Sequence, residues 1–481
     1  MKAMKYLFMA ALMTGFSSAA TAQDGSKADV DAVKQIVSSK PADLDKQLKP
    51  FFNKNKKNVE NLVAFGRVFY EARDTARARV YANQALTVSK YKCAPAFILL
   101  GDIEALGDDT NAGGRAAEQY DQAIMADPKN PDGYYKYALV NRKLAPQLAV
   151  QRLDELKQQR PDVEVNAIKG HIFAISNKDN DAYEAYSKAA IDKLDRGNLS
   201  EYASCSFFSG HHAEGMKVVE YAITRFPRYA TFNRLGMMFG VELKEYDKAI
   251  AFADRFFNAS DSVLTNHNHE YYYQGLAYDG KKDYDKAIEL YKKALTIKSE
   301  GNLIAEDKVI KSISDAYKSK GDFDNAAQYL RDYVAKKDKA TFSDHESIAK
   351  LFLLQASDTT ITKEAKEAAL GKADAVYEEL AKTSGDNELY VLYQRANIGM
   401  QLDPELQSGA AKPFYEKIIE VIEQKPNRED SDTPILRTAY HYMMSRSLLI
   451  DKNKPLAKEY AAKILAIDPN YKAAQAVSDL K

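Results

Sequence analysis

A two-helix pattern between Tyr271 and Ser299 constrains the fold more than any other feature of the sequence. Two runs with helical periodicity are separated by a polar break at Gly280-Lys281-Lys282-Asp283. Small and aromatic residues stand at fixed offsets in the two runs: Tyr271, Gly275, Tyr278, Ala287, Tyr291 and Ala294. Two helices can approach closely where one of them presents a small residue. The stretch therefore predicts a helix–turn–helix unit.

Copies of this spacing recur along most of the chain. Gly66 and Gly170 stand at the position of Gly275, and Ala78 and Ala182 stand at that of Ala287. Four prolines are predicted to end second helices, because proline cannot continue a helix: Pro128, Pro161, Pro227 and Pro469. One unit cannot bury its apolar face alone, whereas stacked units share a continuous core. The repeats therefore predict an all-α solenoid.

The offsets carry a resemblance to a known family. They match the pattern W-x2-L-G-x2-Y followed by A-x3-F, with Tyr271 and Tyr291 at the Trp and Phe positions and Gln274 at the Leu position. Over about Asn58 to Tyr471 the chain resembles the tetratricopeptide-repeat superfamily. The resemblance implies a right-handed superhelical solenoid of helix–turn–helix repeats. Because the signature residues are core residues, the pattern is specific for architecture and unspecific for function.

The pattern also predicts how the chain is divided. We expect a signal peptide at 1–22 and an N-terminal helical cap at 23–57. Repeats 1–8 are expected at 58–340, irregular repeats 9–11 at 341–470, and a capping helix at 471–481. The caps would cover the exposed apolar faces at the ends of the array.

The first residues have the pattern of a signal peptide. Lys2 and Lys5 precede the apolar run Tyr6–Gly15, and Ala20-Thr21-Ala22 forms a cleavage site before Gln23. A run this short cannot span a bilayer, so we expect no integral membrane segment. The competing interpretation is a buried N-terminal helix. We therefore expect a chain exported to the bacterial periplasm, with outer-membrane association or secretion as alternatives.

Composition and motifs argue against two classes of function. The chain has 68 basic and 68 acidic residues, so no positive excess exists to bind nucleic acid. No GxxxxGK[ST], HExxH, GxSxG or CxxC motif occurs. We therefore expect that the protein is not an enzyme and that it has no catalytic site, no metal site and no cofactor. His267 and His269 could hold a metal ion, but a polar loop entering a helix explains them more simply. Cys93 and Cys205 are expected to be unbridged, partly buried thiols.

The family resemblance also implies a binding surface. In this superfamily the first helices of the repeats line the concave surface and hold extended peptides or partner helices. The partner-binding residues implied by position are Tyr135, Arg142, His171, Asn233, Met237, His269, Tyr272 and Asp279. The competing interpretation is that several of these side chains only pack against neighbouring repeats.

Three functions are compatible with this pattern. The leading hypothesis is a non-enzymatic scaffold of the cell envelope that binds a partner protein or peptide in the concave groove. The second is a glycan-binding component of an outer-membrane uptake system, although such proteins usually carry a lipid-anchoring cysteine that this chain lacks. The third is an enzyme whose site lies in the insertion at 357–362.

Overall fold

The computed structural model describes residues 24–142, 146–259, 268–297 and 304–480. Within these ranges the regular structure is helical and contains no strand. Contacts divide the chain into two compact units, Met1–Thr265 and Asn266–Lys481. The repeat spacing runs through this division without a break, so the sequence pattern did not mark it. The expected signal peptide at 1–22 lies outside the described residues.

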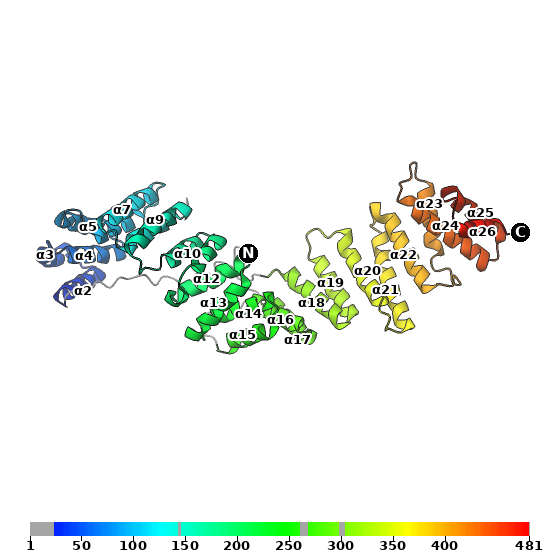
Figure 1. The fold of residues 1–481 in the computed structure, drawn as a ribbon, viewed down its shortest axis with the longest axis horizontal. Helices are drawn as coiled ribbons and strands as arrows, with labels where there is room; N and C mark the ends of the chain where they lie inside the picture. Colours follow the sequence, from blue (N-terminus) through cyan, green and yellow to red (C-terminus); the bar gives the residue numbers. More distant parts are fainter. Residues whose placement is uncertain (1–23, 143–145, 260–267, 298–303, 481) are drawn as a thin grey trace. The chain divides into compact units, whose positions relative to one another are not determined.

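The first unit begins with the helices α2 (Asp24–Ser39) and α3 (Leu44–Asn55), which lie within the segment expected to form a cap. Helices that follow one another in the sequence then pack side by side (Figure 1). They are α4 (Val59–Glu71), α5 (Thr75–Ser89), α6 (Ala94–Glu104), α7 (Ala112–Ala126), α8 (Pro131–Asn141), α9 (Pro146–Gln159), α10 (Val165–Ile175), α11 (Asp179–Ser187), α12 (Arg196–Phe208), α13 (His212–Arg225), α14 (Ala230–Glu242) and α15 (Tyr246–Ala259), with a short 3-10 helix η1 (Ile191–Lys193) before α12.

The second unit continues the same arrangement of paired helices. Its helices are α16 (Asn268–Gly280), α17 (Tyr284–Thr296), α18 (Glu306–Lys320), α19 (Phe323–Ala335), α20 (Phe342–Ala356), α21 (Lys363–Ala381), α22 (Glu388–Leu402), α23 (Lys412–Glu423), α24 (Asp432–Leu449), α25 (Lys454–Ile467) and α26 (Lys472–Ser478), with a 3-10 helix η2 (Gly385–Asn387) before α22. From α4 to α25 we call the even-numbered helix of each pair the first helix and the odd-numbered one the second helix. The predicted all-α fold of helix–turn–helix units is confirmed.

Glycines on first helices explain how the two helices of a pair approach so closely. A Cβ atom built on Gly275 would lie 2.5 Å from Cε1 of Tyr291, so the aromatic ring occupies the space that a side chain would need. Other glycines are covered by a ring of the second helix in the same way: Gly101 by Tyr120, Gly170 by Tyr186 and Gly236 by Phe252. The small and aromatic positions of the sequence pattern are thus two halves of one contact.

The turns between helices are set by local chemistry. The predicted helix ends are confirmed, because α7, α9, α13 and α25 each stop two residues before Pro128, Pro161, Pro227 and Pro469. Several second helices start at an aspartate that accepts a hydrogen bond from a backbone N–H of the first turn, namely Asp74, Asp283 and Asp322. The residue before each cap has a positive φ, namely Arg73, Lys282 and Gly321. This left-handed residue lets the chain reverse direction.

First helices of the first unit also pack on one another. α4 contacts α6, α6 contacts α8, and the same holds for α8 with α10, α10 with α12, and α12 with α14. Side chains that neighbouring first helices turn toward each other can therefore interact across repeats. We call the surface that these helices share the first-helix face.

Candidate functional site

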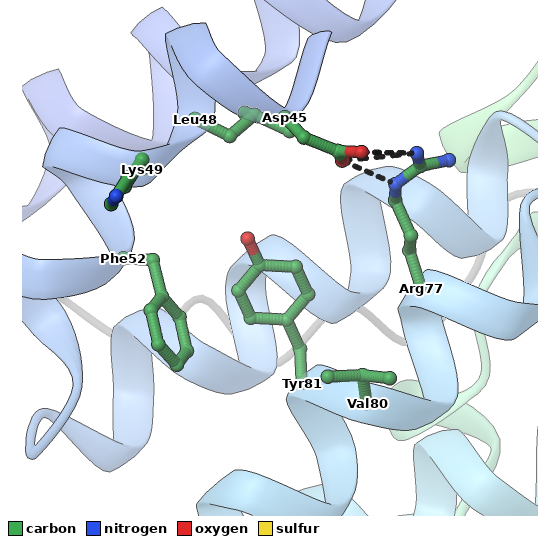
Figure 2. Close-up of a pocket in the computed structure, with 7 residues that line it drawn as sticks. All are labelled: Asp45, Leu48, Lys49, Phe52, Arg77, Val80 and Tyr81. Carbon is green, nitrogen blue, oxygen red and sulfur yellow. Dashed lines mark hydrogen bonds and ion pairs between the residues drawn. The ribbon is translucent and has the colours of Figure 1, made fainter.

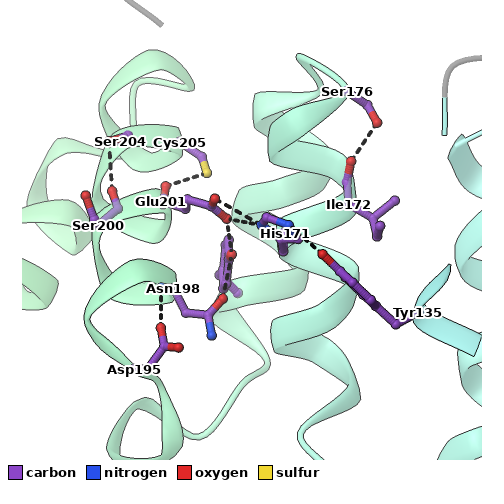
Figure 3. Close-up of polar contacts among 11 residues, drawn as sticks. Tyr135, His171, Ile172, Ser176, Asp195, Asn198, Ser200, Glu201, Ser204 and Cys205 are labelled. Atoms are coloured by element: carbon purple, nitrogen blue, oxygen red, sulfur yellow. Dashed lines mark hydrogen bonds and ion pairs between the residues drawn. The ribbon is translucent and has the colours of Figure 1, made fainter. Parts of the chain in front are cut away.

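Three side chains from successive first helices form a polar row on the first-helix face (Figure 3). Tyr135 lies on α8, His171 on α10 and Glu201 on α12. Nε2 of His171 lies 3.2 Å from the Tyr135 hydroxyl, and Nδ1 lies 2.9 and 3.0 Å from the two carboxylate oxygens of Glu201. The sequence had singled out Tyr135 and His171, and the structure brings them together. All three side chains are half-buried.

The chemistry of the row fixes where a proton lies. A carboxylate can only accept hydrogen bonds, so Nδ1 of His171 carries a hydrogen that it donates to Glu201. In the neutral imidazole Nε2 is then the acceptor, and the Tyr135 hydroxyl donates to it. The two rings are nearly parallel, with centroids 6.0 Å apart and an interplanar angle of 27°. The row is therefore held in one orientation before any partner arrives.

A buried tyrosine anchors the carboxylate of the row. The Tyr186 hydroxyl, on α11, donates to Glu201 over 2.6 Å and lies 3.2 Å from Oδ1 of Asn198. Tyr186 is fully buried, and burial together with the charge of Glu201 raises its pKa well above the usual value. The phenol therefore stays protonated and remains a donor. Burial also raises the pKa of Tyr135.

A second polar cluster joins first helices nearer the N-terminal end of the same unit. The buried carboxylate of Asp102, on α6, lies 2.6 Å from Nη1 of Arg67 on α4 and 2.7 Å from Nζ of Lys136 on α8. It also accepts a hydrogen bond of 2.9 Å from the Tyr120 hydroxyl. Arg67 and Lys136 thus share one carboxylate, and sequence analysis had identified none of these residues as candidates.

Arg142 is a further residue that was predicted to bind a partner, and it lies near the polar row. It follows the last residue of α8, and its guanidinium donates to the backbone oxygen of Leu139. The side chain is half-buried and folds back on the end of its own helix. Arg142 can therefore still present N–H groups to a ligand, since a guanidinium has several donors.

Four other predicted residues lie inside their units. Asn233 and Met237 on α14 are fully buried, as is His269 on α16, and Tyr272 is 3% exposed. Asn233 donates to the backbone oxygen of Pro227 over 3.1 Å. The Tyr272 hydroxyl lies 3.1 Å from Oγ of Ser312. These positions agree with the competing interpretation that the side chains pack against neighbouring repeats. A role for them in binding stays a prediction.

Asp279, on α16 in the second unit, is half-buried. Its carboxylate accepts a hydrogen bond of 3.2 Å from the Tyr291 hydroxyl. Burial is the main cause that raises the pKa of Asp279, and the nearby charge of Asp315 adds to it. The residue serves the packing of its own repeat through Tyr291, and its role toward a partner also stays a prediction.

Glu201 was missed by the sequence reasoning although it holds the polar row together. It lies in the fifth repeat, where the pattern is degenerate. One repeat of about 34 residues after His171 leads to Cys205. Glu201 precedes Cys205 by one helical turn and therefore lies on the same helix face. A search for partners one turn to either side of the expected position could have found it.

Among the described residues, no three His, Cys, Asp or Glu side chains come together in a way that could hold a metal ion. In the same ranges, no helix combines the length and the apolar character needed to cross a membrane.

Family models match two stretches of the second unit. Residues 269–300 and 312–335 each match a tetratricopeptide-repeat model. The chain contains tetratricopeptide repeats. The first match contains the whole of the two-helix pattern at Tyr271–Ser299, and the second contains part of α18 and all of α19. A search of curated proteins finds no relative.

Solved structures of helical repeat proteins are similar to this chain. One is the C-terminal part of a TPR repeat-containing protein from Cytophaga hutchinsonii, with 20% identity, 58% of this chain and 100% of that chain covered, and a TM-score of 0.37. A tetratricopeptide repeat protein from Parabacteroides merdae has 14% identity, coverage of 54% and 98%, and a TM-score of 0.32. The human IFIT1 dimer with PPP-AAAA has 14% identity, coverage of 78% and 95%, and a TM-score of 0.32.

Proposed function

We propose that the protein is a non-enzymatic scaffold that binds a partner protein or peptide on the first-helix face of its first unit. Tetratricopeptide repeats generally mediate contacts between proteins, and a scaffold of this kind is typically non-catalytic. The observation that carries the proposal is the polar row of Tyr135, His171 and Glu201. It presents half-buried polar groups that Glu201 and Tyr186 already hold in place.

Preorganisation is the physical reason to favour this surface. Binding a partner costs free energy for every side chain that must be ordered, about 0.5–1.5 kcal/mol for a flexible one. Tyr135 and His171 are already ordered within the fold, because each is hydrogen-bonded on the first-helix face, so binding does not have to order them. Arg142 adds guanidinium donors beside the end of α8. The surface therefore suits a partner with hydrogen-bond acceptors and an aromatic or planar group.

We also propose that the scaffold acts in the bacterial cell envelope after export. The support is the sequence of the first residues, which has a charged start, an apolar run and a cleavage site before Gln23. Cell fractionation and N-terminal sequencing of the mature protein test this proposal. A mature chain that begins at Gln23 in the periplasmic fraction is expected. A cytoplasmic chain that retains Met1 would contradict it.

The binding proposal is tested by cross-linking and pull-down from envelope fractions. The double variant Tyr135→Ala with His171→Ala is expected to lose most of the partner, since it removes both side chains that the row presents. The matched control is Tyr91→Ala, because Tyr91 is 66% exposed in a turn away from the row. Equal recovery by the double variant and the wild type would show that another surface carries the contact. Turnover of a substrate by the purified protein would refute the non-enzymatic part.

A further inference from the structure

A shallow hollow lies between α3 and α5, away from the polar row. Its walls are Leu48, Lys49 and Phe52 from α3 and Val80 and Tyr81 from α5, with Asp45 and Arg77 at one end (Figure 2). The α3 residues follow one another at helical spacing on one face, and so do those of α5. We call this hollow the α3–α5 groove. Its volume is about 280 Å³, just below the range of small-molecule pockets, which starts near 300 Å³. The groove has room for one large side chain.

The floor of the groove is apolar and packed, whereas its mouth is open. Leu48 and Tyr81 are buried, and the Phe52 ring packs edge-to-face on Tyr81 with centroids 5.8 Å apart. Val80 is 61% exposed at the edge of this floor. Covering apolar surface that faces water is favourable, at about 25 cal/mol per Å². An apolar side chain of a partner would gain that free energy here without rearranging the floor.

The charges around the groove indicate what the rest of the partner carries. Residues 44–57 contain five lysines and one acidic residue, Asp45, although the whole chain is neutral. Asp45 is already bound by Arg77, whose Nε and Nη2 lie 3.1 and 3.2 Å from its oxygens. Among the residues that the structure describes, Lys49 and Lys56 have no carboxylate within ion-pair distance. Both are exposed.

The position of Lys56 extends the groove beyond the hollow. Its backbone oxygen accepts a hydrogen bond of 3.4 Å from Nε2 of Gln84 on α5. Gln84 lies one helical turn beyond Val80 and Tyr81, on the same side of α5. The groove thus runs from the Asp45–Arg77 ion pair, past Lys49 and the apolar floor, to Lys56. An extended partner segment would meet an apolar hollow flanked by unpaired cations.

We propose that the α3–α5 groove is a second docking surface, for an acidic peptide segment that inserts one large apolar side chain. The apolar side chain packs against Phe52, Val80 and Tyr81. Carboxylates on both sides of it pair with Lys49 and Lys56. This surface lies on α3, in the N-terminal cap, and on α5, the second helix of the first pair. It is therefore independent of the first-helix face and of the function proposed for that face.

The test uses a defined probe and the full mature chain. A mixture of fluorescein-labelled decapeptides carries a central pair drawn from Leu, Met and Phe, flanked on each side by four Asp or Glu residues. Fluorescence anisotropy is expected to show saturable binding that weakens as salt is raised, because the ion pairs are exposed. Replacing the central pair by Ser-Ser is expected to weaken binding by about tenfold or more, which corresponds to about 1.4 kcal/mol.

Variants locate the binding on the protein. Val80→Glu, and separately Lys49→Glu with Lys56→Glu, are each expected to weaken binding by about tenfold or more. Matched controls make the same changes elsewhere in the first unit. Met125→Glu alters a side chain that is 67% exposed on α7, and Lys129→Glu with Lys188→Glu alters two exposed lysines in turns. Both controls are expected to bind like the wild type. Because all of the substituted residues are exposed, the variants should fold, which circular dichroism checks.

Three results would overturn the proposal. The first is that no peptide of the mixture binds, or that binding survives the Val80 and Lys variants. The second is that anionic phosphatidylglycerol vesicles bind through the same residues while the peptides do not. The groove would then bind a membrane surface and not a peptide. The third is dimerisation in sedimentation experiments that Val80→Glu abolishes, which would make a second copy of this chain the occupant.

Discussion

At the scale of single residues, the helix pairs depend on contacts between glycines and aromatic rings. The ring of Tyr291 lies over Gly275 and cannot move aside easily, because its hydroxyl donates to Asp279 and it packs on Tyr272 at 5.5 Å. Gly371 on α21 offers the opposite case, since a Cβ atom added there would meet nothing within 4 Å. The same substitution is therefore expected to have opposite effects at the two sites.

We expect Gly275→Ala to lower the free energy of unfolding by about 1–3 kcal/mol, because the new methyl group overpacks the ring contact. Gly371→Ala should raise it by about 0.5–1 kcal/mol, since alanine has less conformational entropy to lose in a helix. Thermal unfolding followed by circular dichroism measures both, at about 2–4 °C per kcal/mol for a unit of this size. A destabilised Gly371→Ala variant, or an unchanged Gly275→Ala variant, would contradict this account.

At the scale of elements, charged caps fix where helices begin. α20 starts with a capping box in which Thr341 Oγ1 accepts from the backbone N–H of Asp344, and the Asp344 carboxylate accepts from the backbone N–H of Thr341 over 2.8 Å. Nζ of Lys337 lies 2.7 Å from the same carboxylate. The lysine first, and then Thr341, lower the pKa of Asp344 to about 2.

This shift gives a pH-dependent prediction. A carboxyl whose pKa is lower in the folded state stabilises the fold above its unfolded pKa, about 3.9, and loses that effect as pH falls toward 2. Asp344→Asn should therefore cost about 0.5–1 kcal/mol at neutral pH, where the negative charge favours the helix start. Its difference in melting temperature from the wild type should close between about pH 4 and pH 2. The control Asp338→Asn changes an exposed acid in the same turn. A pH-independent difference for Asp344→Asn would contradict the assignment.

At the scale of the whole molecule, each helix pair contacts mainly its neighbours. Stability in such arrays is close to a sum of repeat and nearest-neighbour contributions, so a local defect should spread little. The defect introduced by Gly170→Ala is well defined, because the added Cβ atom would lie 2.7 Å from the Tyr186 ring. Tyr186 also anchors Glu201, so the defect reaches the polar row.

We expect Gly170→Ala to lower the hydrogen-exchange protection of backbone amides in α10, α11 and α12. Amides in α20 to α25 should keep their wild-type protection. Hydrogen-exchange mass spectrometry of the full chain makes the comparison. Gly114→Ala is the matched control, since nothing lies within 4 Å of a Cβ atom added at Gly114. A uniform loss of protection along the whole chain would show that the array unfolds as one cooperative body.

The fold could be predicted because its determinants are local. The offset from Gly275 to Tyr291, the polar break after Gly280 and the prolines after second helices act within about 34 residues of each other. These features specify a helix, a turn and a second helix before any distant contact forms. The repeated register also places Tyr135 and His171 on equivalent faces of α8 and α10, where the two rings meet, and their role in binding stays a prediction.

The sequence by itself thus determined that this protein is an array of paired helices, and only the tertiary structure decided which side chains meet between pairs. The angle at which one pair stacks on the next brings Glu201 to His171, and it buries Asn233 and Met237 although their registers match those of Tyr135 and His171. The α3–α5 groove likewise depends on how the cap lies against the first repeat. Periodicity gives the face of a helix on which a residue lies, but packing between elements decides whether that face is covered.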